Sequence, residues 1–240
     1  MDDTDHALVI ITYSTDRYIK RLPVAVKSLI NSGYPGDVFI VDDGSVNAHH
    51  SQYLRRCKYE VIYREKNGGV SKAKNTALKL LQHYKFGFIA EDDVLFKSKW
   101  WEPYLEAHSI TGIHHFSWTW NKEKDLVRDA QKVNEYFITK TSLVNGCFLT
   151  VTPEIIKTVG GFKVLPAKWG HEHTNWTRRI IRAKLAPYFC DILHSNNYIG
   201  LQNVNSVVSD RDKYYFDLSN AEYATSKYVK SNPIKLPLEE

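Results

Sequence analysis

The sequence is poor in cysteine, and its cysteines are scattered. Only three occur in 240 residues, Cys57, Cys147 and Cys190, and none belongs to a Cys-x-x-Cys pair. An odd number of distant cysteines does not suit a disulfide framework or a zinc ribbon. The spacing therefore excludes a small disulfide-stabilised domain and favours a reducing compartment.

Long apolar runs are also missing. The longest, such as Ala7–Ile11, are far shorter than the roughly 18 residues that indicate a membrane span. The N-terminal residues MDDTDH lack the basic region of a signal peptide. We expect a cytoplasmic protein with at most peripheral membrane contact.

Glycine and proline are too few for a low-complexity chain, at 12 and 8 residues. Hydrophobic residues make up 43% and charged residues 25%, as in ordinary globular proteins. The formal net charge of +5 suits an anionic ligand but is weaker than that of a typical nucleic-acid-binding protein. We therefore expect no nucleic-acid partner.

Short β-rich apolar runs alternate with helical patterns in the first part of the chain. One apolar stripe of helical spacing contains Leu22, Val26, Leu29 and Ile30, and a second runs from Val70 to Tyr84. The β-rich runs are Ala7–Thr12, Val38–Val41, Glu60–Tyr63 and Phe86–Ala90. This alternation predicts an α/β fold with a mostly parallel sheet, whose ligands bind outside the carboxyl ends of the strands.

The composition changes after about residue 96, since all six tryptophans lie between positions 100 and 176. Residues 111–120 and 146–151 resemble strands. Helices are expected from Thr152-Pro153 to Gly160, and from about 174 to 185. We expect two halves of one domain, at 1–95 and 96–205, and a C-terminal tail at 206–240.

Acidic residues stand at the ends of two predicted strands. Asp42-Asp43 follows one strand, and Glu91-Asp92-Asp93 follows another. Neighbouring parallel strands bring such carboxylates to one edge of the sheet, where they repel one another unless they bind a polar ligand or share a divalent cation. The pattern indicates a ligand site, although an Asp after a strand is also ordinary turn chemistry.

The turn Asn67-Gly68-Gly69 opens a predicted helix whose first turns contain Lys72 and Lys74. Backbone N–H groups at a helix start, with ammonium groups nearby, suit a phosphate or a nucleotide base. The spacing is neither G-x-G-x-x-G nor a Walker loop, which argues against a dinucleotide-binding enzyme and a P-loop NTPase.

Four blocks in chain order resemble those of family 2 glycosyltransferases, which have the GT-A fold: TYSTDRYIKRLPVAVKSL, VDDGS, NGGVSKAKNTAL and FIAEDDV. The resemblance covers roughly residues 8–185. It implies a mostly parallel central sheet flanked by helices, with a Rossmann-like nucleotide-binding half at 1–95 and a fused acceptor-binding and catalytic half of the same domain at 96–205.

The resemblance also implies a nucleotide site. In that family the end of the first strand and the second Asp of the DDGS block hold the uracil of a nucleotide sugar, and an Arg usually stands where this chain has Lys74. The predicted nucleotide-binding residues are Thr12, Ser14, Asp43, Asn67, Gly69, Lys74 and Asp92.

A metal site follows from the same resemblance. The acidic motif of the family corresponds to Glu91-Asp92-Asp93, with Asp92 toward the ribose, Asp93 on the metal, and Glu91 in place of the usual first Asp. His194 resembles the late His that completes the metal site in some relatives. We expect Mn²⁺ or Mg²⁺, which stabilises a departing diphosphate.

The segment KWGHEHTNWTRR resembles the acceptor-side block of several GT-A families. Glu172 matches the acidic residue that faces the acceptor, and His173 occupies the position of the base in inverting members. Both are candidate catalytic residues, and the stereochemistry stays open. Four tryptophans are candidates for stacking on sugar faces, with core packing as the alternative: Trp118, Trp120, Trp169 and Trp176.

The expected activity is metal-dependent transfer of a sugar, as in hexosyltransferases, from a UDP-sugar or related nucleotide sugar to a carbohydrate or other hydroxyl acceptor. Two alternatives stay open. The histidines beside the acidic pairs also suit a metal-dependent phosphoester hydrolase, and the departures at Glu91 and Lys74 suit a non-catalytic nucleotide-sugar-binding protein.

Overall fold

The computed structural model describes residues 5–14, 19–118, 131–133, 136–141, 146–164 and 171–202, together with positions 235, 237 and 238. Of the expected tail at 206–240, only positions 235, 237 and 238 fall within this part of the chain.

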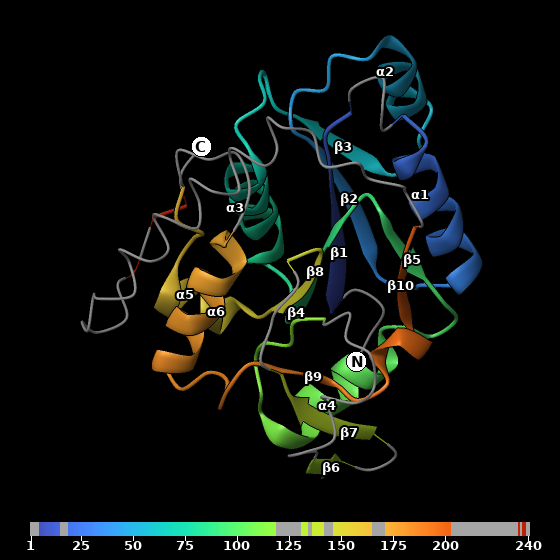
Figure 1. The fold of residues 1–240 in the computed structure, drawn as a ribbon. Helices are drawn as coiled ribbons and strands as arrows, with labels where there is room; N and C mark the ends of the chain where they lie inside the picture. The colour runs from blue at the N-terminus through green and yellow to red at the C-terminus, as the bar shows by residue number, and fades with distance from the viewer. Residues whose placement is uncertain are drawn as a thin grey trace.

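A five-stranded sheet forms the centre of the molecule (Figure 1), with the strand order β3-β2-β1-β4-β8. Its strands are β1 (His6–Thr12), β2 (Asp37–Asp42), β3 (Glu60–Tyr63), β4 (Phe86–Glu91) and β8 (Phe148–Val151). The first four are parallel, and β8 pairs antiparallel with β4. The predicted mostly parallel sheet is thus confirmed.

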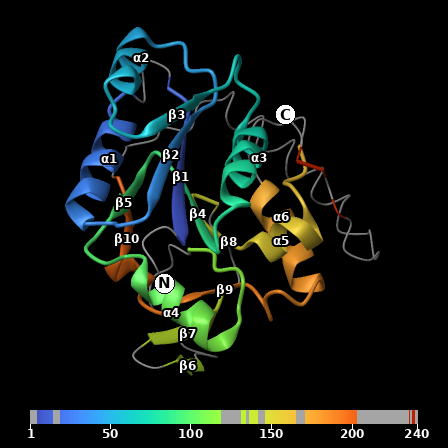
Figure 2. The same cartoon turned by 180° about the vertical axis from the view of Figure 1, so that it is seen from behind.

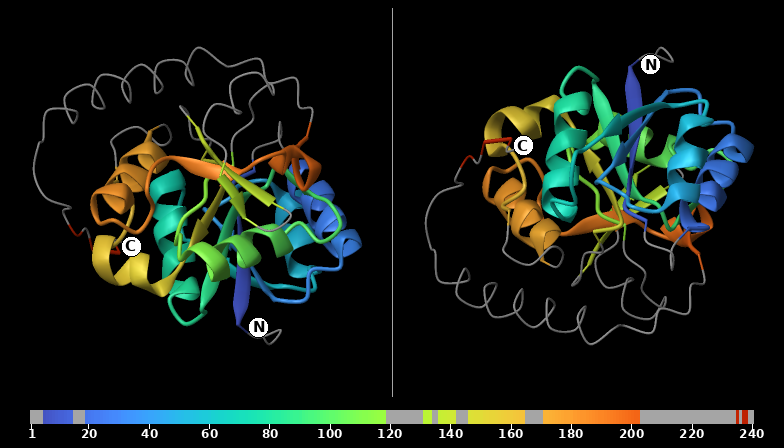
Figure 3. Two further views of the ribbon diagram at one scale, coloured as in Figure 1. Left: turned by 90° about the horizontal axis from the view of Figure 1, so that it is seen from below. Right: turned by 90° about the horizontal axis from the view of Figure 1, so that it is seen from above.

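Helices cover both faces of this sheet. Figures 1 and 2 show α1 on one side, and α3 with α5 and α6 on the other, while α2 lies beyond the ends of β2 and β3. Figure 3 shows the same layers from below and above. The helices just named are α1 (Arg21–Ser32), α2 (Ala48–Arg55), α3 (Val70–Leu81), α5 (Pro153–Val159) and α6 (Glu172–Arg182).

The two apolar stripes form helices close to their expected positions. In α1, Leu22, Val26 and Leu29 are buried, because their spacing places them on one helix face. Ile30 is 48% exposed, so its predicted place on the buried stripe is wrong. Gly33 ends α1 in the left-handed region, with φ of 74°, which glycine adopts without steric cost.

The second half of the chain adds two small antiparallel sheets, one beside the central sheet near α1 and one below it (Figure 1). One has the order β10-β5 and the other β6-β7-β9. Their elements, with the adjoining helices, are β5 (Val94–Phe96), α4 (Glu102–Thr111), β6 (Gln131–Val133), β7 (Tyr136–Lys140), β9 (Cys190–Ile192), the 3-10 turn η3 (Ser195–Asn197) and β10 (Ile199–Leu201). Aromatic rings of Phe88, Trp100, Tyr104 and Phe148 pack together and join these elements to β4 and β8.

The structure differs from the expected elements in three respects. Residues 111–120 do not form a strand within the described part of the chain: Thr111 ends α4, and the following segment makes one isolated bridge, Ser117 to Leu149. Its backbone hydrogen bonds are instead divided between β8, at Phe148 and Thr150, and the later residues Leu185 and Cys190, so no ladder forms. The expected helix at 174–185 begins earlier and ends earlier, as α6. The short helices α2 and α4 were not expected at all.

Candidate functional site

The strand register places the acidic residues at one edge of the sheet. Thr12 at the end of β1 pairs with Asp42 at the end of β2, and Ile11 pairs with Glu91 at the end of β4. The two acidic motifs therefore flank the end of β1 from both sides. This is the arrangement that the positions after parallel strands predict.

Thr12 connects the two motifs. Its hydroxyl donates to Asp92 Oδ2 at 2.5 Å, and the His50 Nε2 atom lies 3.5 Å from the same hydroxyl and 3.9 Å from Asp42 Oδ1. Burial raises the pKa of Asp92 to about 7, although the Thr12 hydrogen bond opposes the shift. Burial also lowers the pKa of His50, against the pull of Asp42.

The loop after β2 is held against the end of β1. Asp42 Oδ1 accepts a hydrogen bond from the Ser45 hydroxyl at 2.5 Å, and the backbone N–H of Ser14 donates to Ser45 Oγ at 2.8 Å. Gly44 has φ of 70°, and a Cβ there would lie 2.5 Å from the backbone carbon of Lys66. Only glycine fits at this position, so the DDGS block closes against the turn before α3.

Asp43 is bound to that turn. Its Oδ1 accepts from Arg64 Nε at 2.7 Å and from the Gly68 N–H at 3.1 Å, and its Oδ2 accepts from the Gly69 N–H at 2.9 Å. Asn67 Oδ1 accepts from the same Gly69 N–H at 3.1 Å. Burial raises the pKa of Asp43, although all three donors favour its ionised form. The structure thus brings the predicted nucleotide-side residues Asp43, Asn67 and Gly69 together.

Glu91 and Asp93 form the exposed rim of the acidic motif, with side chains 32% and 23% exposed. Asp93 Oδ1 is buried and has no hydrogen-bond partner among the described residues, and Asp93 Oδ2 lies 3.9 Å from Arg21 Nη1. Burial, followed by the Glu91 charge, raises the pKa of Asp93 to about 6. Crowded carboxylate oxygens with an unfilled acceptor position fit a hard divalent cation.

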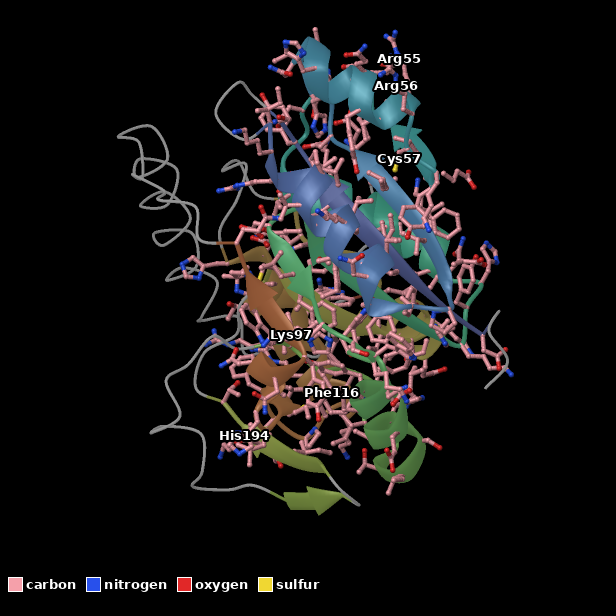
Figure 4. The ribbon with its side chains drawn as sticks, turned by 90° about the vertical axis from the view of Figure 1, so that its right-hand side faces the viewer. Arg55, Arg56, Cys57, Lys97, Phe116 and His194 are labelled. Atoms are coloured by element: carbon pink, nitrogen blue, oxygen red, sulfur yellow. The ribbon has the colours of Figure 1, made fainter. Side chains whose placement is uncertain are left out.

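His194 lies elsewhere. It precedes η3, whose Asn196 carbonyl accepts a hydrogen bond from Lys97 Nζ, at the end of β5 that is farther from Asp93. Figure 4 shows His194 near Lys97, at the opposite end of the molecule from Arg55 and Arg56 of the α2 region. Within the described ranges, no three His, Cys, Asp or Glu side chains form a metal-holding group.

Lys74 occupies the space between the acidic motif and α6. Its side chain is 0% exposed, and Nζ donates to Gly146 O and to Glu172 Oε1, both at 2.9 Å. Nζ also lies 3.3 Å from Glu91 Oε1. Burial alone lowers the pKa of Lys74, but the Glu172 and Glu91 charges outweigh it and raise that pKa above its usual value. Lys74 is therefore an ammonium group shared by the two carboxylates.

Glu172 and His173 begin α6 beside this ammonium. Glu172 is 4% exposed, and His173 Nδ1 lies 3.3 Å from Glu172 Oε1, with the His173 side chain 17% exposed. Burial raises the pKa of Glu172, but Lys74 and His173 overcome it and hold the pKa well below its usual value. A Cβ on Gly146 would lie 2.6 Å from His173 Nδ1, so a glycine there lets the imidazole approach the backbone.

Two of the four candidate tryptophans are described, and both are buried. Trp118 is 1% exposed, and Trp176 is 0% exposed, stacks on Phe162 and donates its indole N–H to Gly160 O. Core packing accounts for both rings. Trp120 and Trp169 lie outside the described residues.

Four residues of the site were not expected from the sequence. Arg64 is a single basic residue outside the motifs, Arg21 lies within the first block but had no predicted role, His50 belongs to a helix that was not expected, and Gly146 is a lone glycine before β8. The one signal for Arg64 was its place between β3 and the glycine turn, from which its side chain reaches Asp43 at the end of β2.

The fold and the strand-end carboxylates together define a glycosyltransferase of the GT-A type. Three solved structures share the fold: the UDP complex of residues 1–349 of TarS from S. aureus (TM-score 0.57, 15% identity), GalNAc-T7 with UDP, GalNAc and Mn²⁺ (0.60, 12%), and the mannosyltransferase PcManGT from Pyrobaculum calidifontis with GDP-Man and Mn²⁺ (0.57, 13%). The matches cover 79%, 80% and 98% of this chain, and 58%, 42% and 68% of those chains. This chain thus spans little more than half of the TarS fragment.

The chain belongs to glycosyl transferase family 2, whose model matches residues 7–163. An uncharacterized glycosyltransferase of Acanthamoeba polyphaga mimivirus is 35% identical over 202 residues, which cover 80% of this chain and 79% of that protein. The resemblance in the sequence blocks is therefore confirmed. No helix in the described ranges is long and apolar enough to cross a membrane.

Proposed function

We propose that the protein transfers a hexose from a nucleotide sugar, with a UDP-sugar as first choice, to a hydroxyl acceptor, assisted by a divalent cation. The observation that supports this most is the pair of acidic motifs at the ends of β2 and β4, on either side of Thr12. Related folds have been solved with UDP or GDP-Man, and two of them with Mn²⁺.

The nucleotide would lie along the ends of β1, β2 and β4. The raised pKa of Asp43 reflects a carboxylate that burial disfavours in spite of its donors, and a base N–H would add a further donor. Asp92, whose pKa is about 7, is suited to a ribose hydroxyl because it accepts or donates a hydrogen bond near neutral pH. Thr12 and Ser14 would complete the nucleotide side. Lys74 would act on the nucleotide only indirectly, through Glu91.

Asp93 and Glu91 would hold Mn²⁺ or Mg²⁺. When bound, the cation stabilises the negative charge of a leaving diphosphate. His194 stands apart from these carboxylates, so we propose a cation bound by Asp93, Glu91 and the diphosphate itself.

On the acceptor side, we propose that His173 accepts the proton of the acceptor hydroxyl and that Glu172 orients the imidazole of His173. A carboxylate with a strongly lowered pKa is a poor proton acceptor but a good partner for one imidazole nitrogen. The acceptor oxygen forms the new bond to the sugar, and its proton moves to His173. The bond between the sugar and the diphosphate oxygen breaks, and that oxygen retains the electron pair.

A ligand panel followed by a turnover assay tests the proposal. Nucleotide diphosphates and nucleotide sugars, each with and without Mn²⁺, should raise the melting temperature, because ligands that bind the native state stabilise it. Release of UDP or GDP from an accepted donor then shows turnover. Binding without turnover would favour a nucleotide-sugar-binding protein. Phosphoester cleavage with metal and no nucleotide would favour a hydrolase.

A further inference from the structure

One cation lies on the donor side in a position that the proposed activity does not yet use. Arg21 is the first residue of α1, and its side chain is 20% exposed. Its Nη1 atom lies 3.9 Å from Asp93 Oδ2, which is longer than a direct hydrogen bond. The guanidinium therefore lies beside the carboxylate without a direct hydrogen bond between these two atoms.

The backbone of Arg21 is fixed to the acidic motif by Gln202. Gln202 Nε2 donates to Arg21 O at 2.9 Å and to Asp92 O at 3.1 Å, and the Gln202 N–H donates to Asp93 O at 2.9 Å. One side chain thus joins the start of α1 to the end of β4. Because three hydrogen bonds hold this junction, the Arg21 backbone keeps a fixed place relative to Asp93.

The local charge balance calls for a further cation. Glu91, Asp92 and Asp93 stand together, and Lys74 is shared between Glu91 and Glu172. A diphosphate brings more negative charge to this edge, so its affinity depends on every cation within reach.

We propose that Arg21 binds the terminal phosphate of the nucleotide diphosphate and stabilises the charge that develops there as the sugar departs, and that Gln202 is the positioning residue for Arg21. A guanidinium suits this task, because its planar donors match phosphate oxygens two at a time. The inference rests on the proposed function and names the residue that recognises the leaving group.

Calorimetry with UDP and UMP in the presence of Mn²⁺ tests the inference. Arg21→Gln should weaken UDP binding about 10- to 100-fold and UMP binding less than threefold, because UMP lacks the terminal phosphate. Arg21→Lys should keep part of the UDP affinity through its charge. The UDP-to-UMP affinity ratio is independent of partial misfolding, since both nucleotides need the same folded base site.

Two variants complete the design. Lys20→Gln, at the exposed neighbouring position, should leave the ratio unchanged. Gln202→Ala should lower the ratio several-fold in the parent but not in the Arg21→Gln background, because neighbours that act through one group are not additive. An unchanged ratio in Arg21→Gln, with a parent that binds UDP, would overturn the inference alone. A parent that binds no nucleotide diphosphate would overturn the proposed function itself.

Discussion

The donor side and the acceptor side of the site both contain nearly buried carboxylates, but their charges are balanced in opposite ways. Burial raises the pKa of Asp92 to about 7 and that of Asp93 to about 6, although the Thr12 hydrogen bond to Asp92 and the Arg21 charge oppose these shifts. Glu172 is as buried as Asp92, yet its pKa is held well below its usual value, chiefly by the Lys74 ammonium at 2.9 Å.

This difference indicates the side at which we propose that an external cation binds. The acceptor side has its own counter-ion, fixed by two hydrogen bonds within the protein. The donor side has an excess of negative charge and a buried Asp93 Oδ1 without a partner among the described residues. A divalent cation and a diphosphate would bind where the charge is unbalanced, and the acceptor chemistry would proceed where it is already balanced.

Replacing Lys74 should have the largest effect, a loss of unfolding free energy through the acceptor side. Lys74→Met leaves Glu172 and Glu91 without their shared ammonium, and breaking a buried pair costs about 3–5 kcal/mol of unfolding free energy. Lys72→Met, on the same helix but only half-buried, should cost about 1 kcal/mol or less. Denaturant unfolding of both variants measures the difference. Equal losses would show that Lys74 does not balance the two carboxylates.

Glu172→Gln should reduce catalysis without weakening the donor complex. The amide keeps the size of the side chain but loses the charge that orients His173, so sugar transfer should fall about 10²-fold or more. Affinity for the nucleotide should stay nearly unchanged. Glu154→Gln, on the exposed face of α5, is the matched control. Transfer at the parental rate would remove Glu172 from the proposed chemistry.

Asp92→Asn should stabilise the metal-free protein, with a gain that depends on pH. In the parent, the folded protein holds the Asp92 proton up to about pH 7, whereas the unfolded chain releases it near pH 4. The parent therefore loses stability as the pH rises from about 4 to 7, and the variant does not. We expect a gain of roughly 1–3 kcal/mol at pH 8 that shrinks toward pH 4. A gain independent of pH in chelator-treated samples would contradict the raised pKa.

Arg64→Lys should have the smallest effect. Lysine keeps the charge near Asp43 but loses the fork that also reaches Lys72 O and Thr76 Oγ1, so nucleotide affinity should fall about twofold to fivefold. Arg56→Lys, exposed at the end of α2 (Figure 4), should change nothing. Calorimetric titration of UDP into both variants measures their nucleotide affinities. Unchanged affinity in Arg64→Lys would show that the orientation of Asp43 by Arg64 does not matter for binding.

The sequence predicts the arrangement of the strand ends on the proposed donor side well, because its signals are local. The strands before Asp42 and Glu91 are continuous apolar runs, and parallel pairing then brings their ends together without further information. The helix after the glycine turn also follows from its spacing. Ile30 shows the limit of such patterns, since it lies at the edge of the α1 stripe and faces solvent.

The acceptor side was less predictable because it depends on contacts between distant segments. Lys74, Gly146 and Glu172 come from three elements, and no spacing in the sequence relates them. Lys74 was expected beside the nucleotide, and its direct contact with a nucleotide stays a prediction. The apolar segment at 111–120 resembles a strand, but its backbone hydrogen bonds are divided between β8 and residues 185–190, which a sequence pattern does not reveal.

Titration of UDP into the protein with and without Mn²⁺, for the parent, Asp93→Ala and Glu172→Gln, tests the charge comparison most directly. We predict that Mn²⁺ strengthens UDP binding to the parent and to Glu172→Gln, because both keep the unbalanced donor-side charge. Asp93→Ala should retain its fold and lose the Mn²⁺ dependence. Mn²⁺-dependent UDP binding that survives in Asp93→Ala, or that disappears in Glu172→Gln, would contradict a cation site on the donor side.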